Sequence, residues 1–336
     1  MDAFDALLER ARNNPKHIVL AEGEDPRVVE GALRAVRDRL ASVTLLGRRD
    51  AVLALVDEDL RDDPRVSVVD PATAEGRGRF VELLVKLRQH KGMTEEKAQE
   101  QVLLPQNYAN LMVRSGLADG TVAGAQLSTA DVVRSAIQII GVDKRYSMIS
   151  SFFIMLFNEE FHDPKGAMIF ADCGLVVAPE EDELVQIGTA AADNAAALMG
   201  MEPRIAMLSF STRGSASHPN VDRVRNAAEK IRAQRPDLSV DGELQLDAAI
   251  VPSVGGRKAP GSEVAGQANV LVFPDLQSGN IGYKLAERVG QAKAIGPVLQ
   301  GLAKPANDLS RGCDADAVYR MIAVTAVQAQ NTDTKE

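Results

Sequence analysis

One short segment near the C-terminus gathers residue types that can bind an anion and move a proton. It reads NDLSRGCDADAVY, residues 307 to 319, and holds a serine, an arginine, a glycine and three carboxylates. An arginine presents its N–H donors in a planar fork that matches the oxygens of phosphate or carboxylate. A carboxylate can accept a proton where its surroundings raise its pKa. The segment therefore raises the question of which carboxylate, if any, could act as a base.

The other side chains of this segment have structural interpretations. Asp308 precedes the serine and is expected in a turn, while Asp314 and Asp316 are expected at the start of a helix, where acids cap free N–H groups. Cys313 is a candidate nucleophile, but the carboxylates that follow it disfavour the thiolate. We interpret Cys313 as a small packing residue. No covalent nucleophile is indicated.

Three more polar, glycine-containing segments are each expected to follow a strand. They are SFSTRGSASHPN (209–220), which contains Arg213, PSVGGRKAPGSE (252–263), and FPDLQSGNIGYK (273–284), which leads from Asp275 into a helix. Ligands of open α/β sheets collect at the carboxyl ends of strands, and the first amides of a helix can hold an anion. Each segment alone is typical of an ordinary turn. Four such segments in one half of the chain are more than folding requires.

Two arginines of the first half also stand out. Arg88 lies at the end of a predicted helix that Gly92 closes, and cations at that position complement the helix dipole. In STADVVRSAIQII, Ser128 or Thr129 is expected to cap a helix that carries Arg134 on an otherwise apolar surface. A desolvated arginine is seldom placed there without an anion to meet.

Several classes of function lack their sequence signals. The net charge is −9, from 38 basic and 47 acidic residues, which argues against nucleic acid or an anionic membrane as a partner. The P-loop spacing, G-x-G-x-x-G and G-x-S-x-G are absent. No signal peptide, transit peptide or membrane span is indicated, so we expect a cytoplasmic protein. No metal site is expected, because the histidines are scattered: His17, His90, His162 and His218.

Short β-branched runs alternate with helical patterns along the chain, which predicts an α/β fold with mostly parallel sheets. In HIVLAEGEDP a strand is followed by Asp25 as helix cap and Pro26 at the first helical position. Other predicted strands are SVTLLG, VSVVD, AMIFAD, RIAMLSF, LDAAIVPS and NVLVFPD. Two domains are expected at 336 residues, with a boundary near residues 145–150.

Taken together, the segments resemble the phosphate acetyltransferases, with the phosphate butyryltransferases as close relatives. The likeness covers essentially the whole chain and includes LRQHKGMT, STADVVRSAIQII, SFSTRGSASHPNV, GELQLDAAIVPSV, NVLVFPDLQSGNIGYKLAERVG and IGPVLQGLAKPANDLSRG. It implies reversible acetyl transfer between acetyl phosphate and coenzyme A by direct thiolate attack, with coenzyme A as substrate and no tightly bound cofactor.

The resemblance also implies an architecture. It is two αβα-sandwich domains of the isocitrate and isopropylmalate dehydrogenase type, with the active site in the cleft between them, in a homodimer. Since the C-terminal helix returns to the first domain in that fold, the expected domains are 1–149 plus 312–336, and 150–311. GELQLDAAI and NDLSRG favour acetyl over butyryl transfer.

On the matched motifs, the resemblance assigns roles to individual residues. Arg311 is expected to hold phosphate and carbonyl oxygens, and Ser310 to hydrogen-bond the developing oxyanion or the thiol. Arg88 and Arg134 match arginines that bind coenzyme A and phosphate. The remaining candidates for substrate binding are Ser128, Thr129, Thr212, Arg213, Gly279 and Asn280.

One position departs from the family pattern. The family has an aspartate seven residues after the serine of S-R-G, as the base that deprotonates coenzyme A, and this chain has Ala317 there. Asp316 is either a substitute base or only a capping residue. Three hypotheses remain: an active phosphate acetyltransferase, a catalytically weakened regulatory protein that binds coenzyme A, and a nicotinamide-dependent hydroxyacid dehydrogenase. The last is disfavoured, because no aspartate cluster for a divalent metal accompanies the motifs.

Overall fold

The structure is a computed structural model that describes residues 3–162 and 165–333. These residues form two compact units. The N-terminal unit comprises Leu7–Lys144 and Leu302–Glu336, and the central unit comprises Met1–Ala6 and Arg145–Gly301. Each unit contains its own sheet with helices packed on it. The predicted two-unit α/β fold is confirmed.

The units change at residues 144 and 301, and the expected domain division used residues 149 and 311. The difference at the second boundary has a local reason. Residues 306–308 form a strand of the N-terminal sheet, so the chain has rejoined that unit before the S-R-G segment begins. The division into domains 1–149 plus 312–336 and 150–311 stays a prediction.

The N-terminal sheet is parallel throughout, in the order β11-β4-β1-β2-β3. The central strand β1 therefore has β4 on one side and β2 on the other, and β11 joins the outer edge of β4. The strands are β1 (Lys16–Leu20), β2 (Ala41–Leu46), β3 (Val66–Val69), β4 (Gly120–Ala123) and β11 (Ala306–Asp308).

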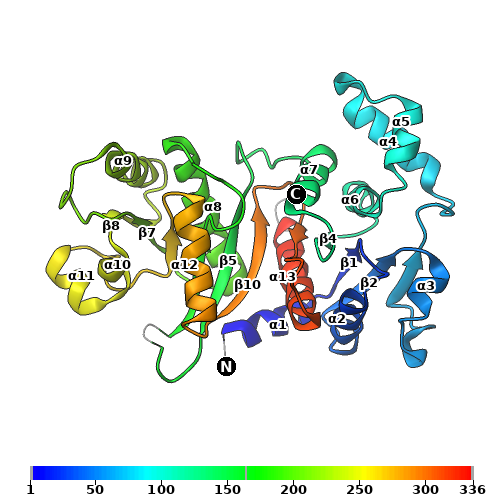
Figure 1. Ribbon diagram of the computed structural model, residues 1–336, viewed down its shortest axis with the longest axis horizontal. Coiled ribbons are helices and arrows are strands. Elements are labelled where there is room, and N and C mark those ends of the chain that lie inside the picture. The colour runs from blue at the N-terminus through cyan, green and yellow to red at the C-terminus, as the bar shows by residue number, and fades with distance from the viewer. Residues whose placement is uncertain (1–2, 163–164, 334–336) are drawn as a thin grey trace. The chain divides into compact units, whose positions relative to one another are not determined.

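Side chains of β1 point alternately to the two faces of this sheet, and they are buried on both. Val19 belongs to a cluster with residues of α4, α6 and α7, while Ile18 and Leu20 are fully buried and point to the opposite face. On that face α13 packs against α2, β1 and β4. In Figure 1, α13 is red and α2 is blue. The helices are α1 (Ala3–Asn13), α2 (Pro26–Arg37), α3 (Arg49–Leu53), η1 (Glu58–Leu60), α4 (Arg77–Arg88), η2 (Gln89–Lys91), α5 (Glu95–Gln101), α6 (Pro105–Ser115), α7 (Thr129–Ile139) and α13 (Ala315–Asp333).

The central sheet is mixed, in the order β10-β5-β6-β9-β7-β8. Its parallel part runs from β6 to β8, and β5 is antiparallel to both of its neighbours. The strands are β5 (Ser150–Phe157), β6 (Gly166–Ala171), β7 (Arg204–Leu208), β8 (Ser239–Leu244), β9 (Val270–Val272) and β10 (Lys293–Gln300).

Helices cover the central sheet on both faces. Met168 and Phe170 of β6 pack on the face that carries α10 and α12, and α8 and α9 pack together against the strands. The helices are α8 (Glu181–Met199), α9 (Pro219–Gln234), α10 (Leu246–Ile250), α11 (Pro252–Lys258) and α12 (Leu276–Arg288).

Two local predictions in this unit were wrong. LDAAIVPS was expected as a strand but forms helix α10, and the segment that begins at Pro252 was expected as a loop but forms helix α11. Pro252 occupies the first turn of α11, where its missing N–H leaves no helical bond unmade. The strand of this region is β8, in SVDGEL, which the sequence analysis missed.

Candidate active site

The carboxyl ends of three neighbouring strands carry most of the predicted site in the N-terminal unit. β1, β4 and β11 are parallel neighbours, so the segments that follow them meet at one edge of the sheet. These segments are residues 21–25, 124–128 and 309–313. Leu309 is buried, and its N–H donates to Ala123 O at 2.7 Å. Ser310 and Arg311, which follow it, are exposed.

The loop after β4 is shaped by a carboxylate from the loop after β1. Glu22 accepts the backbone N–H groups of residues 125, 126 and 127 at 2.8, 2.8 and 2.9 Å. Ser128 then caps α7, because its side chain accepts the N–H of Asp131. Since Glu22 already accepts these N–H groups, they are not available to an anionic substrate.

Arg27 connects all three segments. Its guanidinium donates to both oxygens of Asp25, at 3.0 and 2.7 Å, and to Ala125 O at 3.0 Å. It also donates to Arg311 O at 2.9 Å and to Cys313 O at 3.0 Å. Asp25 is the predicted N-cap of α2, so the helix start fixes the arginine. Arg27 therefore holds the backbone of the S-R-G turn while the Arg311 side chain stays exposed.

A glycine makes room for the junction between β4 and β11. Gly124 has a φ of +106°, and a Cβ there would overlap Asp308 Oδ1 and lie 2.7 Å from Leu309 N. Both the backbone conformation and the space exclude a side chain. The S-R-G turn can approach the loop after β4 this closely only because residue 124 is glycine.

We expect Gly124→Ala to lower the free energy of unfolding by about 3 kcal/mol, because strain and overlap add. Gly92→Ala is the matched control: Gly92 has a φ of +79° as the predicted helix cap, but nothing lies within 4 Å of its Cβ position. Its cost should be about 1 kcal/mol, from the backbone alone. Urea unfolding of both variants measures the difference, and equal losses would contradict the steric argument.

Asp308 is not the turn residue that the sequence suggested. It is the last residue of β11 and has no exposed surface. Its Oδ2 accepts the hydroxyl of Thr129, the first residue of α7, at 2.6 Å. Its Oδ1 has no hydrogen-bond partner within the described residues. Burial is the main cause that raises the pKa of Asp308, the hydrogen bonds of Thr129 and of the Leu309 N–H lower it, and the nearby charge of Glu22 raises it; the result is a pKa of about 7.

The other two carboxylates of the segment serve α13. Asp314 Oδ1 accepts the N–H of Ala317 at 2.8 Å, which is the predicted capping interaction. Asp316 pairs with Arg34 at 3.1 Å and with Arg320 at 2.7 Å. Partial burial would raise the pKa of Asp316, but hydrogen bonds and charges of both arginines outweigh it, so this pKa lies below its usual value. A base with a lowered pKa is a weak proton acceptor.

The two arginines of the first half differ in their surroundings. Arg88 is the last residue of α4 and is half-buried. Arg134 was expected to be desolvated, and this was wrong: its side chain is 61% exposed and pairs with Asp131 at 2.8 Å, one turn earlier. Arg134 is therefore accessible to an anion but already has a partner.

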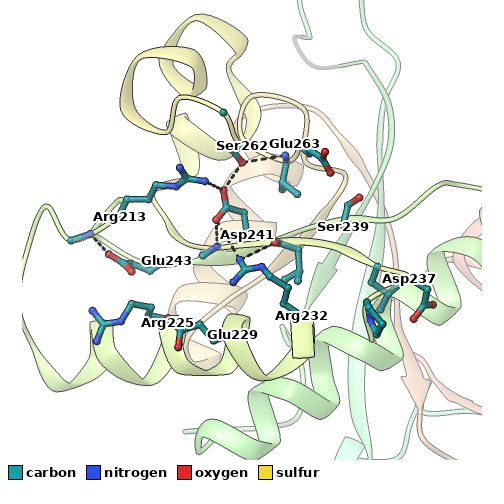
Figure 2. Close-up of a pocket in the computed structure, with 17 residues that line it drawn as sticks. Arg213, Arg225, Glu229, Arg232, Asp237, Ser239, Asp241, Glu243, Ser262 and Glu263 are labelled. Carbon is teal, nitrogen blue, oxygen red and sulfur yellow. Dashed lines mark hydrogen bonds and ion pairs between the residues drawn. The ribbon is translucent and has the colours of Figure 1, made fainter. Parts of the chain in front are cut away.

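In the central unit, Thr212 and Arg213 follow β7 and are held in place by neighbouring strands. The hydroxyl of the buried Thr212 accepts the N–H of Gln245 at 3.0 Å. Arg213 donates to Asp241 Oδ2 at 2.8 Å and to Pro260 O at 3.2 Å, on the wall of a cavity of about 850 Å³ beside β8. Figure 2 shows Asp241 between Arg213, Arg232 and Ser262. The guanidinium of Arg213 is thus engaged within its own unit.

Buried carboxylates organise the loops of this unit as well. Glu243, fully buried, accepts the Ser211 hydroxyl at 2.9 Å and the Gly214 N–H at 2.7 Å. Asp172 accepts the N–H groups of Ser151, at 2.7 Å, and of residues 174 and 175. Burial raises the pKa of Asp172, against the effect of these hydrogen bonds.

Gly279 and Asn280 contact the loop that Asp172 organises. A Cβ at Gly279 would overlap the carbonyl oxygen of Asp172, and Asn280 Nδ2 donates to Cys173 O at 3.2 Å. Asp275 caps α12 by accepting the N–H of Ser278 at 2.8 Å. The first turn of α12 therefore already has an acceptor from its own chain.

The sequence analysis missed four residues that shape these loops: Glu22, Arg27, Asp172 and Glu243. Each lies at a strand end or in the first turn of the following helix, and three of them are acids. Acids that directly follow an apolar run were a signal that the sequence offered. No sequence signal indicated their distant partners, such as Cys313 for Arg27, Ser151 for Asp172 and Ser211 for Glu243, which lie 286, 21 and 32 residues away along the chain.

In the described ranges, the structure holds no group of three or more His, Cys, Asp or Glu that could bind a metal ion. Among the same residues, no helix is long and apolar enough to cross a membrane.

An α/β chain in which an exposed serine–arginine pair follows a strand, amid further arginines, has the features of an enzyme for anionic substrates. This chain belongs to the phosphate acetyl/butaryl transferase family, whose model matches residues 2–326. It is 46% identical to the phosphate acetyltransferase of Thermoanaerobacterium thermosaccharolyticum over 331 residues, 98% of this chain and 100% of that one. It is 46% identical to the phosphate acetyltransferase of Paracoccus denitrificans over 330 residues, with the same coverage.

Solved structures of related enzymes are similar to this chain as well. A phosphotransacetylase from Streptococcus pyogenes, 42% identical, superposes with a TM-score of 0.91 over 98% of both chains. A branched-chain phosphotransacylase from Enterococcus faecalis, at 18% identity and a TM-score of 0.66 over 93% of this chain and 98% of that one, shares the fold.

Proposed function

We propose that this protein is a phosphate acetyltransferase, which converts acetyl phosphate and coenzyme A into acetyl-CoA and phosphate, and the reverse. The observation that carries the proposal is the match over nearly the whole chain to relatives named phosphate acetyltransferase. The exposed Ser310 and Arg311 support it, because acetyl transfer needs donors for the developing oxyanion and for the departing phosphate.

The roles proposed for individual residues follow from the matched motifs, and for Ser310 and Arg311 also from their exposure. Arg311 grips the phosphate and carbonyl oxygens, and Ser310 donates to the oxyanion. Arg88 and Arg134 bind the anionic groups of coenzyme A, and Ser128 places the start of α7. In the central unit, the proposed substrate-binding residues are Thr212, Arg213, Gly279 and Asn280. Since Gly279 and Asn280 contact backbone, they act through the shape of their loop.

The test is to mix the purified protein with coenzyme A and acetyl phosphate and to follow the thioester absorbance. Turnover supports the proposal, and binding of coenzyme A without turnover would sink it. The same assay with butyryl phosphate in place of acetyl phosphate tests the acyl specificity. We expect turnover to be faster with acetyl phosphate.

The second candidate function is a regulatory protein that binds coenzyme A with weakened catalysis. It is favoured by one observation: residue 317 is alanine, and the neighbouring Asp316 is engaged by two arginines. Calorimetric binding of coenzyme A together with turnover below about one per minute would support this candidate instead.

A homodimer is also proposed. Helix α12 and its C-cap residue expose Ile281, Leu285 and Val289, at 58%, 55% and 74%, which are spaced four residues apart. An apolar stripe can pair with its own copy about a two-fold axis. We expect light scattering to give twice the 36.0 kDa mass of one chain, and Leu285→Glu to shift it towards the monomer. A monomeric wild type would contradict this.

The location proposed is the cytoplasm. Both cysteines, Cys173 and Cys313, are buried and free, as expected in a reducing compartment. Cell fractionation tests this.

A further inference from the structure

The proposed reaction needs a group that takes the proton of the coenzyme A thiol, and Asp316 is a weak acceptor in this chain. A thiol with a pKa of about 8.5 is mostly protonated at neutral pH, and only the thiolate attacks well. Asp316 is held by two arginines that lower its pKa, and Asp314 caps α13. Of the three carboxylates in NDLSRGCDADAVY, this leaves Asp308.

Asp308 has the contacts of a proton acceptor that works through a hydroxyl. It lies two residues before Ser310 and has no exposed surface of its own. Its Oδ2 is 2.6 Å from Thr129 Oγ1, and Thr129 is half-buried at the start of α7. Its Oδ1 has no hydrogen-bond partner in the described part of the chain, and although the backbone N–H of Leu309 lowers the pKa of Asp308, the pKa stays above its usual value.

We propose that Thr129 and Asp308 form a proton relay for the coenzyme A thiol; the proposal rests on the proposed acetyl transfer. The S–H bond breaks and its proton passes to Thr129 Oγ1, while the hydroxyl proton of Thr129 passes to Asp308 Oδ2. The sulfur electron pair forms the C–S bond, and the C–O bond to phosphate breaks. The proton returns through Thr129 to the oxygen of the leaving phosphate, so the relay ends as it began.

The electrostatics around Asp308 suit this role. Burial and the charge of Glu22, which follows β1, together raise its pKa to about 7 against the hydrogen bonds of Thr129 and Leu309. β4 has no ionisable side chain, Asp131 of α7 is bound by Ser128 and Arg134, and Asp316 of α13 pairs with Arg34 and Arg320. An acceptor of pKa about 7 is half ionised at neutral pH and takes a thiol proton at an equilibrium disadvantage of about 30-fold. This lies in the range in which general bases work.

The relay predicts a particular pH dependence. Only ionised Asp308 accepts a proton, so kcat/KM of the wild type should rise with pH through an inflection near 7. We expect Asp308→Asn to keep an acceptor for Thr129 but to lower kcat about 100-fold at pH 7. The inflection near 7 should disappear, and the rate should climb towards the pKa of the thiol.

Thr129 supplies a second pair of variants. Thr129→Val removes the hydroxyl, so its kcat should fall and the inflection of its pH profile near 7 should disappear, as in Asp308→Asn. Thr129→Ser keeps a hydroxyl and should retain that inflection. Thr94→Val is a control for the loss of a threonine hydroxyl at a helix start: Thr94 caps α5 by accepting the N–H of Lys97, and its loss should leave the rate unchanged. If Asp308→Asn fails to fold, the comparison of Thr129→Val with Thr129→Ser tests the relay instead.

A rescue experiment separates the relay from a purely structural role. Ala317→Asp in the Asp308→Asn background places a carboxylate one residue beyond Asp316, and at least 10-fold recovery supports the relay. The relay is overturned if Asp308→Asn has the rate and the pH profile of the wild type. It is also overturned if Asp308→Asn loses activity and the added Ala317→Asp does not restore it. An active Thr129→Val overturns it too. A wild type without turnover would instead reject the proposed function.

Discussion

Replacing Arg311 with alanine is expected to lower kcat for acetyl-CoA formation about 1,000-fold and to leave the fold intact. The guanidinium is exposed and has no ion pair within the described residues, so little native structure depends on it. A donor to a developing oxyanion is worth about 100- to 1,000-fold in rate, and Arg311 is proposed to contact phosphate oxygens as well. The measurement is steady-state kinetics with coenzyme A and acetyl phosphate.

Two variants sharpen this result. Arg311→Lys keeps the charge without the planar fork, so we expect an intermediate rate. Arg288→Ala is the control: it removes an arginine of α12 whose side chain is 79% exposed, and kcat should stay unchanged. A drop below about fivefold for Arg311→Ala would remove Arg311 from the proposed chemistry.

The features that the sequence predicted well are those that depend on near neighbours in the chain. Asp25 caps α2 by accepting an N–H two residues on, Ser128 caps α7 three residues on, and Gly92 adopts the left-handed conformation. Arg134 shows that a local partner can also be overlooked. Its salt bridge to Asp131 follows the i, i+3 spacing of one helix face, so the sequence contained that information.

The misread segment around α10 had a different cause. LDAAIVPS contains a short apolar run, and such a run is compatible with a buried strand or a short helix. The neighbouring β8 carries Asp241, Gly242 and Glu243, so its polar sequence concealed a strand. Asp241 can be buried there because it pairs with Arg213, and Glu243 because one of its oxygens accepts the Ser211 hydroxyl and the Gly214 N–H. Only the folded partners explain why that strand contains acids.

For the candidate site, the sequence motifs named Ser310 and Arg311, which are exposed, but not the residues that hold their turn in place. The motifs place Ser310 and Arg311 on a turn, but they do not say what fixes the turn. Arg27 reaches Arg311 O across 284 residues of sequence, and Asp308 reaches Thr129 across 179. These contacts exist because β1, β4 and β11 are neighbours, which is a property of strand order rather than of any local pattern.

Arg27→Ala is expected to lower kcat about 100-fold, although Arg27 is proposed to touch no substrate. The variant removes the hydrogen bonds to Arg311 O, Cys313 O and Ala125 O, which together hold the S-R-G turn against the loop after β4. A displacement of about 1 Å at a reacting group can cost this much. Since hydrogen bonds from a charged donor are lost, unfolding should become easier by about 2 kcal/mol.

The chain contains a matched control for this variant. Arg65 forms the same fork with Asp63, two residues earlier, at 3.0 and 2.6 Å, and donates to Val36 O at 2.9 Å. Its side chain is 41% exposed, against 36% for Arg27. Arg65→Ala should therefore destabilise the protein in the same way, as urea unfolding would measure, and leave kcat within about twofold. Equal losses of kcat would mean that Arg27 acts only through global stability; a loss confined to Arg27→Ala would mean that the arginine fixes the position of the turn from which Ser310 and Arg311 act.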